Sequence, residues 1–196
     1  MGRPRKVAGQ TPTDERILSA AEAAFAEHGR DGVSLSAIAS EVGIRAPSLL
    51  YHFPTKHKLY AAVIERVFAD LEKTALENMS VEETLHEQIA GIAEALVSLM
   101  ETRQAFLRLV VREILNPHGE DSPAIEGLNR LATVLTNIVT SRGGGAPGIP
   151  VREAVMQLIS GFLLRAAAAP EVTALWTDTP SYRAMVYRLL LPSIED

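Results

Sequence analysis

The sequence predicts an all-α protein of about nine helices, with a small three-helix unit at the N-terminus and a larger helical part behind it. Two observations carry this prediction. Apolar residues recur at helical spacing along almost the whole chain, and the alternation of apolar and polar residues that marks a strand is found nowhere. Capping residues, prolines and glycines divide these apolar stretches into separate helices.

Four helices are predicted in the N-terminal part of the chain. Residues 11–14 form a capping box with proline at the first helical position, and Gly29 ends the helix that they open. Ser34 caps the second helix, and Gly43 allows a tight turn into the third. The fourth helix is long and carries apolar residues at helical spacing. The four helices cover about residues 12–29, 34–42, 46–52 and 56–78.

Five more helices are predicted in the C-terminal part. A second capping box at residues 80–83 opens the first of them, and prolines at 117, 170 and 192 end others. The glycine-rich segment 142–148 is predicted to be a flexible loop. These helices cover about residues 80–101, 104–115, 123–141, 150–169 and 180–191.

Composition excludes several classes of protein. The chain has no cysteine, and its five histidines never lie at a chelating spacing, so we expect no disulfide, no metal site and no cofactor. No apolar stretch approaches the ~20 residues that a membrane span needs, and no apolar run follows the basic N-terminus as in a signal peptide. We therefore expect a soluble, cytoplasmic protein without membrane contact.

The net charge of −5 hides an asymmetry between the two ends of the chain. Residues 1–58 hold eight Lys and Arg against six Asp and Glu, whereas the rest of the chain holds eleven against eighteen. Such a division predicts an anionic partner at the N-terminal end only.

Residues 34–53 carry the pattern with the clearest function. Small Ala39 suits the crossing of two short helices, and Gly43 suits the turn between them. The second helix presents hydrogen-bonding side chains on a solvent face, where they can contact phosphates and base edges in a major groove. These side chains are Arg45, Ser48, Tyr51 and His52.

The first ~70 residues resemble the DNA-binding domain of the tetracycline-repressor (TetR) family of bacterial transcription regulators. The matching segments are Phe25–Gly29, Ile38–Ile44 and Tyr51–Leu59. Beyond residue 75 the resemblance is architectural only. It implies a homodimer that binds a palindromic DNA operator and, as a repressor, is released by a small-molecule effector. On this basis the chain divides into a basic arm (1–10), a helix-turn-helix domain (11–55) and an effector-binding and dimerisation domain (56–196), and the helix at about 56–78 links the two domains.

The resemblance also implies roles for individual residues in DNA binding. Ser34 and Lys56 would contact phosphates, and Tyr51 and His52 would contact bases or backbone. The start of the recognition helix, which would face base edges, comprises Arg45, Ala46, Pro47 and Ser48. Two departures from the family are Leu50, where many members have an aromatic residue, and His57-Lys58, where an acidic residue is common. The basic arm, Arg3, Arg5 and Lys6, either follows the DNA groove or is an inert solubilising tail.

The last two long helices are where the family places its dimer interface, although the same helices could simply close the monomer core. The residues predicted at the interface are Val155, Leu158, Ile159, Phe162, Ala166, Met185 and Leu189. The three preceding helices would enclose an effector pocket. The side chains predicted to line it, each of which could equally be ordinary core, are Met79, Met100, Phe106, Val110, Arg165 and Trp176.

Two other classes of function compete with a DNA-binding regulator. An enzyme is not expected, because the chain shows no catalytic triad elements, no paired carboxylates in a defined context and no nucleotide fingerprint. A helical scaffold or protein-interaction module, whose helix-turn-helix no longer binds DNA, is the alternative that Leu50 and the net acidity leave open.

Overall fold

The computed structural model describes residues 12–77, 84–115, 122–168, 170–174 and 179–191. The chain forms two compact units, Met1–Val63 and Ile64–Asp196, and each is described here by itself. The chain passes from one unit to the other inside the helix α4 (Lys56–Glu77). The sequence-based boundary lies between residues 55 and 56, at the start of this helix, which was predicted to link the two domains.

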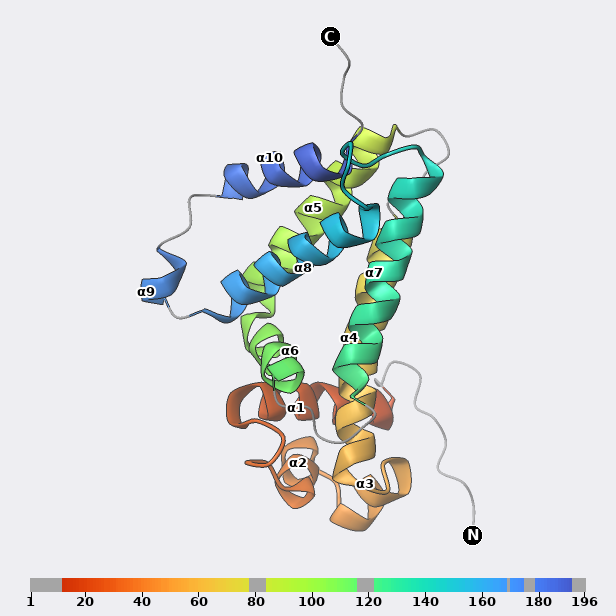
Figure 1. The fold of residues 1–196 in the computed structure, drawn as a ribbon. Coiled ribbons are helices and arrows are strands. Elements are labelled where there is room, and N and C mark those ends of the chain that lie inside the picture. Colours follow the sequence, from red (N-terminus) through yellow and green to blue (C-terminus); the bar gives the residue numbers. More distant parts are fainter. Residues whose placement is uncertain (1–11, 78–83, 116–121, 169, 175–178, 192–196) are drawn as a thin grey trace. The chain divides into compact units, whose positions relative to one another are not determined.

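The N-terminal unit consists of three helices and the first turns of α4 (Figure 1). The three helices are α1 (Thr13–His28), α2 (Leu35–Val42) and α3 (Ala46–His52). Its core is formed by fully buried side chains from all four elements: Ile17, Phe25, Ile38, Leu49, Leu59 and Tyr60. The rings of Phe25 and Tyr60 meet edge to face with their centroids 5.3 Å apart, which fixes the end of α1 against the start of α4.

The caps of these helices show how local sequence sets their ends. Ser34 caps α2 as predicted, because its hydroxyl accepts a hydrogen bond from the backbone nitrogen of Ala37 at 3.1 Å. Gly43 ends α2 in the left-handed region, with φ of 74°, as the turn requires. The predicted capping box of α1 needs correction. The helix begins at Thr13 with Pro12 in the cap position, and proline has no side-chain oxygen to offer; Thr11 lies outside the described residues.

The C-terminal unit contains the rest of α4 and six further helices, and the described residues include no strand. The helices are α5 (Leu85–Thr102), α6 (Gln104–Leu115), α7 (Pro123–Ser141), α8 (Val151–Ala167), α9 (Pro170–Thr173) and α10 (Thr179–Leu190). Helix α8 packs against α6, α7 and α10, and α10 also packs against α5 (Figure 1). The all-α prediction is confirmed; the described residues form ten helices because a single turn, α9, follows the break before Pro170.

The start of α5 differs from the prediction. Helix α5 begins at Leu85 behind a capping box formed by Thr84 and Glu87, whereas the box predicted at 80–83 lies outside the described residues. The Glu87 carboxylate accepts a hydrogen bond from the Thr84 backbone nitrogen at 2.8 Å, and the Thr84 hydroxyl accepts one from the Glu87 backbone nitrogen at 3.3 Å. The hydrogen bonds from Thr84 to the carboxylate lower the pKa of Glu87.

Helix α7 is held closely against α4. A side-chain carbon at Gly127 would lie 2.3 Å from the Phe68 ring, so only glycine lets the two helices approach this closely. Arg130 on the same helix donates hydrogen bonds to Glu65 and Glu72 of α4, at 2.5 and 3.3 Å. These contacts join α7 to the part of α4 that belongs to the C-terminal unit.

Candidate nucleic-acid interface and ligand pocket

The two short helices of the N-terminal unit form a rigid helix-turn-helix. Ile38, Ala39, Val42 and Leu49 are buried between the helices, as the residue types predict. In the turn, the Ile44 backbone nitrogen donates a hydrogen bond to the Ala39 carbonyl at 2.9 Å. Packing and hydrogen bonding therefore leave α3 in one defined orientation on its unit.

The outer face of α3 is polar and open to solvent. Tyr51 is 87% exposed, and its ring meets that of His52 edge to face at a centroid distance of 5.7 Å. The remaining predicted contact residues Arg45, Pro47 and Ser48 are also exposed, whereas Ala46 is half-buried. A large tyrosine left in water by a well-packed helix is available for contact with another molecule. Hydroxyl, imidazole and guanidinium groups on a single helix are suited to base edges and phosphates.

Lys56 has a structural role that the sequence did not reveal. Its ammonium group donates to the carbonyl oxygens of Val33 at 2.9 Å and Asp31 at 3.4 Å, in the loop between α1 and α2. An ammonium has three donors, so a phosphate contact stays a prediction beside this role. Lys58, two residues further on, is exposed to solvent.

Two arginines of the N-terminal unit also serve the fold. Arg16 donates to the Val42 carbonyl at the end of α2, and the Arg30 guanidinium lies 5.8 Å from the centre of the Tyr60 ring. Part of the basic surplus counted in the sequence is thus used inside the unit. The predicted arm residues Arg3, Arg5 and Lys6 lie outside the described residues.

The residues predicted for the dimer interface divide into two groups. Five of them are buried inside the C-terminal unit and cannot be reached by a partner without repacking: Val155, Leu158, Ile159, Phe162 and Ala166. Met185 is 41% exposed, and Leu189 is half-buried. The outer face of α8 instead presents Leu164, 56% exposed, and Gly161, where an added side-chain carbon would meet open space.

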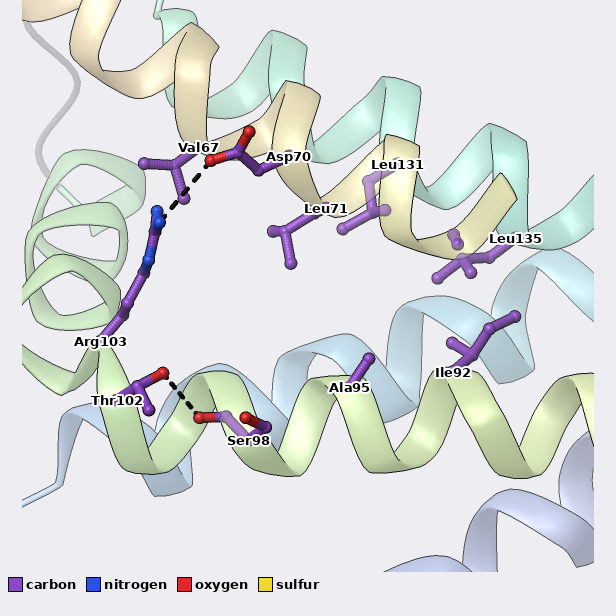
Figure 2. A pocket seen from close by; sticks show the side chains of 11 residues that line it. Val67, Asp70, Leu71, Ile92, Ala95, Ser98, Thr102, Arg103, Leu131 and Leu135 are labelled. Carbon is purple, nitrogen blue, oxygen red and sulfur yellow. Dashed lines mark hydrogen bonds and ion pairs between the residues drawn. The ribbon is translucent and has the colours of Figure 1, made fainter. Parts of the chain in front are cut away.

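A pocket of about 260 Å³ lies in the C-terminal unit, between α4, α5 and α7 (Figure 2). Most of its lining is apolar, with Leu71 of α4, Ile92 of α5, and Leu131 and Leu135 of α7. The polar side chains of the lining are Asp70, Ser98, Thr102 and Arg103. The Arg103 guanidinium pairs with the Asp70 carboxylate at 3.6 Å.

The predicted pocket residues lie elsewhere as far as the structure describes them. Phe106 and Val110 are buried and border a void of only about 20 Å³, so they fill the core. Arg165 is half-buried on α8 and is not among the residues that line the larger pocket. Met79 and Trp176 fall outside the described residues, as does the side chain of Met100. Asp70 and Arg103 are the residues that could have indicated this pocket from the sequence, because each is a charged residue close to the apolar residues of a predicted helix.

Within the described ranges, no group of three His, Asp or Glu side chains is placed to hold a metal ion. In the same part of the chain, no helix is long and apolar enough to cross a membrane.

The fold and its exposed α3 define a helix-turn-helix protein with a separate helical unit. The sequence model described as bacterial regulatory proteins, TetR family, matches residues 17–63. An uncharacterized HTH-type transcriptional regulator of Mycobacterium tuberculosis is 26% identical over 175 residues, which cover 82% of this chain and 90% of that protein. The chain thus carries a segment of the TetR family of bacterial regulatory proteins, residues 17–63, and it is similar to an HTH-type transcriptional regulator over most of its length.

Solved structures show the same fold over nearly the whole chain. Reduced NemR of Escherichia coli superposes with a TM-score of 0.77 at 16% identity, covering 93% of this chain and 99% of that one. AibR, solved with isovaleryl coenzyme A and operator DNA, gives a TM-score of 0.70 at 14% identity, covering 93% and 100%. Because the sequence identities are this low, these two matches show a shared fold and nothing about shared ligands.

Proposed function

We propose that the protein is a ligand-responsive repressor that binds a palindromic DNA operator as a homodimer and is released by a small-molecule effector. The observation that carries the proposal is the polar, solvent-exposed face of α3, with Tyr51 near the C-terminal end of the helix, on a closely packed helix-turn-helix. The protein would act by binding, without catalysis. The described pocket supplies a place for the effector.

The α3 face has the chemistry of a recognition helix. Arg45, Ser48, Tyr51 and His52 would reach base edges or phosphates, and Ala46 and Pro47 would allow close approach at its N-terminal end. Around it, Ser34, Lys56 and Lys58 would bind phosphates, and Arg3, Arg5 and Lys6 would add charge from the arm. That AibR was crystallised with both an acyl coenzyme A and operator DNA supports the pairing of the two activities in this fold.

A titration with DNA separates this function from a scaffold role. Fluorescence anisotropy is measured with a fragment from upstream of the protein's own gene and with unrelated DNA, at several salt concentrations. We expect the upstream fragment to bind at least ~10³-fold more tightly than unrelated DNA at physiological salt. Equal, weak binding of both fragments, in the range of about 10⁻⁴–10⁻⁶ M, would support the scaffold instead.

Dimerisation is proposed because a single seven-residue recognition helix reads few base pairs, and a two-fold dimer reads two half-sites. The burial of the predicted interface residues moves the proposed contact to the outer faces of α8 and α10. Leu164 and Met185 are its exposed apolar side chains, and Gly161 would let a partner helix approach closely.

The variant L164E/M185E tests this contact. Around a two-fold axis each new carboxylate would face its symmetry mate's apolar surface or charge, so we expect the dimer dissociation constant to rise by about a hundredfold or more. Sedimentation equilibrium measures it against the monomer mass of 21.2 kDa. L115E, at an exposed leucine of α6, is the matched control and should stay dimeric. A dimer of unchanged strength in the double variant would place the interface elsewhere.

A further inference from the structure

Among the described side chains that line the pocket between α4, α5 and α7, the polar ones lie at one end. Figure 2 shows Arg103, Thr102 and Ser98 gathered at one end, whereas Ile92, Leu131 and Leu135 lie toward the other. The Thr102 hydroxyl donates to the Ser98 carbonyl at 2.7 Å, which leaves the Arg103 guanidinium as the strong donor of this end. A ligand that matches this pocket has one polar head and an apolar body.

The ion pair at the polar end indicates the charge of the head. The Arg103 guanidinium and the Asp70 carboxylate form an ion pair at 3.6 Å, longer than the 2.7–2.9 Å of a charge-assisted hydrogen bond, so a ligand that hydrogen-bonds to Arg103 could compete with this contact. The Arg103 side chain is 35% exposed and that of Asp70 is 57% exposed. An incoming carboxylate could take over Arg103 while Asp70 turns into water at little cost. A cation that took over Asp70 would leave the less exposed charge, that of Arg103, without its carboxylate, which is the more expensive exchange.

The apolar end adjoins a smaller void of the same unit. Ile92 and Leu135 also border this mostly apolar void of about 40 Å³, which lies between α5, α7, α8 and α10. The main volume of about 260 Å³ corresponds to roughly nine waters at ~30 Å³ each, which sets the scale of the ligand at about ten non-hydrogen atoms. A short, unbranched apolar tail that extends in this direction would contact the apolar side chains of Ile92 and Leu135.

We propose that this pocket binds a small apolar monocarboxylate, whose carboxylate is held by Arg103 and whose tail lies between Ile92, Leu131 and Leu135. The proposal rests on the proposed function only in treating this ligand as the effector. Binding would replace Asp70 as the partner of Arg103 and so release a tie between α4 and the start of α6. Because α4 continues into the DNA-binding unit, ligand and operator would then lower each other's affinity by the same factor.

Calorimetry with three eight-carbon probes tests the class of ligand on the full chain, without DNA. The probes are octanoate, octan-1-ol and octylamine at pH 7, which share a tail and differ in the charge of the head. We expect octanoate to bind about tenfold or more tightly than either of the others, because only octanoate can form charge-assisted hydrogen bonds with Arg103.

Variants then test whether the carboxylate of the ligand binds to Arg103. Arg103→Gln should weaken octanoate about tenfold or more and leave octan-1-ol unchanged, whereas Asp70→Asn, which removes the competing carboxylate, should tighten octanoate. Arg183→Gln is the matched control, because Arg183 pairs with Glu94 outside the pocket lining and its loss should change none of these affinities. If the Arg103→Gln protein does not fold, the octanoate affinity of Asp70→Asn alone tests the role of the ion pair.

Several outcomes would overturn the proposal. They are the absence of octanoate binding, tighter binding of octylamine, an octanoate affinity unchanged in Arg103→Gln, and a weaker one in Asp70→Asn. Since these measurements involve no DNA, a failure here with a positive DNA titration refutes only the ligand class. Octanoate binding without specific DNA binding would refute the proposed function and leave the pocket assignment intact.

Discussion

Tyr51→Ala is expected to weaken binding to the specific operator by ~1–3 kcal/mol, about 5- to 150-fold, and to leave weak binding to unrelated DNA nearly unchanged. The tyrosine is 87% exposed and contributes little to the packing of its own unit, so its loss should not unfold α3. Its side chain would contact bases of the operator and so contribute to sequence specificity. Anisotropy titrations with operator and unrelated DNA, at one salt concentration, measure both effects.

Two matched variants sharpen this result. Tyr51→Phe keeps the ring and removes the hydroxyl, so it shows whether a hydrogen bond or ring contact carries the specificity. Lys58→Ala removes an exposed charge beside the same surface, and should weaken binding to all sequences alike and reduce the salt slope by about one. The assignment of roles would be reversed if Lys58→Ala changed sequence preference and Tyr51→Ala did not. Lys56 is the poorer choice, since its replacement also removes hydrogen bonds to the α1–α2 loop.

The helix-turn-helix could be predicted from sequence because its determinants are local. Ser34 and Gly43 act on backbone groups within a few residues of themselves, and both take the predicted cap positions. The start of α5 was ambiguous for the same reason. Residues 80–83 and 84–87 both carry a hydroxyl residue followed three positions later by glutamate, and a local pattern cannot choose between two such boxes. The structure has the second.

The pocket and the outer face of α8 could not be predicted in this way. A pocket is the space that helices distant in sequence leave between them, so Leu71, Ile92 and Leu131 line it only because α4, α5 and α7 diverge there. An apolar stripe shows that a face is buried, without showing what buries it. On α8 that stripe, with Val155 and Phe162, is covered by the unit's own helices. Individual exposed residues such as Leu164 carry little signal in sequence.

Phe25→Ala is expected to lower the free energy of unfolding of the N-terminal unit by ~3–5 kcal/mol. Phe25 is fully buried, and its ring contact with Tyr60 joins the end of α1 to the start of α4. A cavity at this point would remove a large share of a typical stability of about 5–15 kcal/mol. Urea unfolding followed by circular dichroism measures the loss.

The same variant connects the core of this unit to DNA binding. Phe25 is buried in the core of the N-terminal unit and does not lie on the α3 face. Its loss should therefore weaken binding to operator and to unrelated DNA alike, in proportion to the fraction of unfolded protein. Phe25→Leu keeps most of the buried volume and should lose less of both stability and binding. A Phe25→Ala protein with stability within about 1 kcal/mol of the parent would show that the α1–α4 contact is not what holds the recognition helix in place. A loss of operator binding alone, at full stability, would instead make Phe25 part of the DNA contact, which its burial argues against.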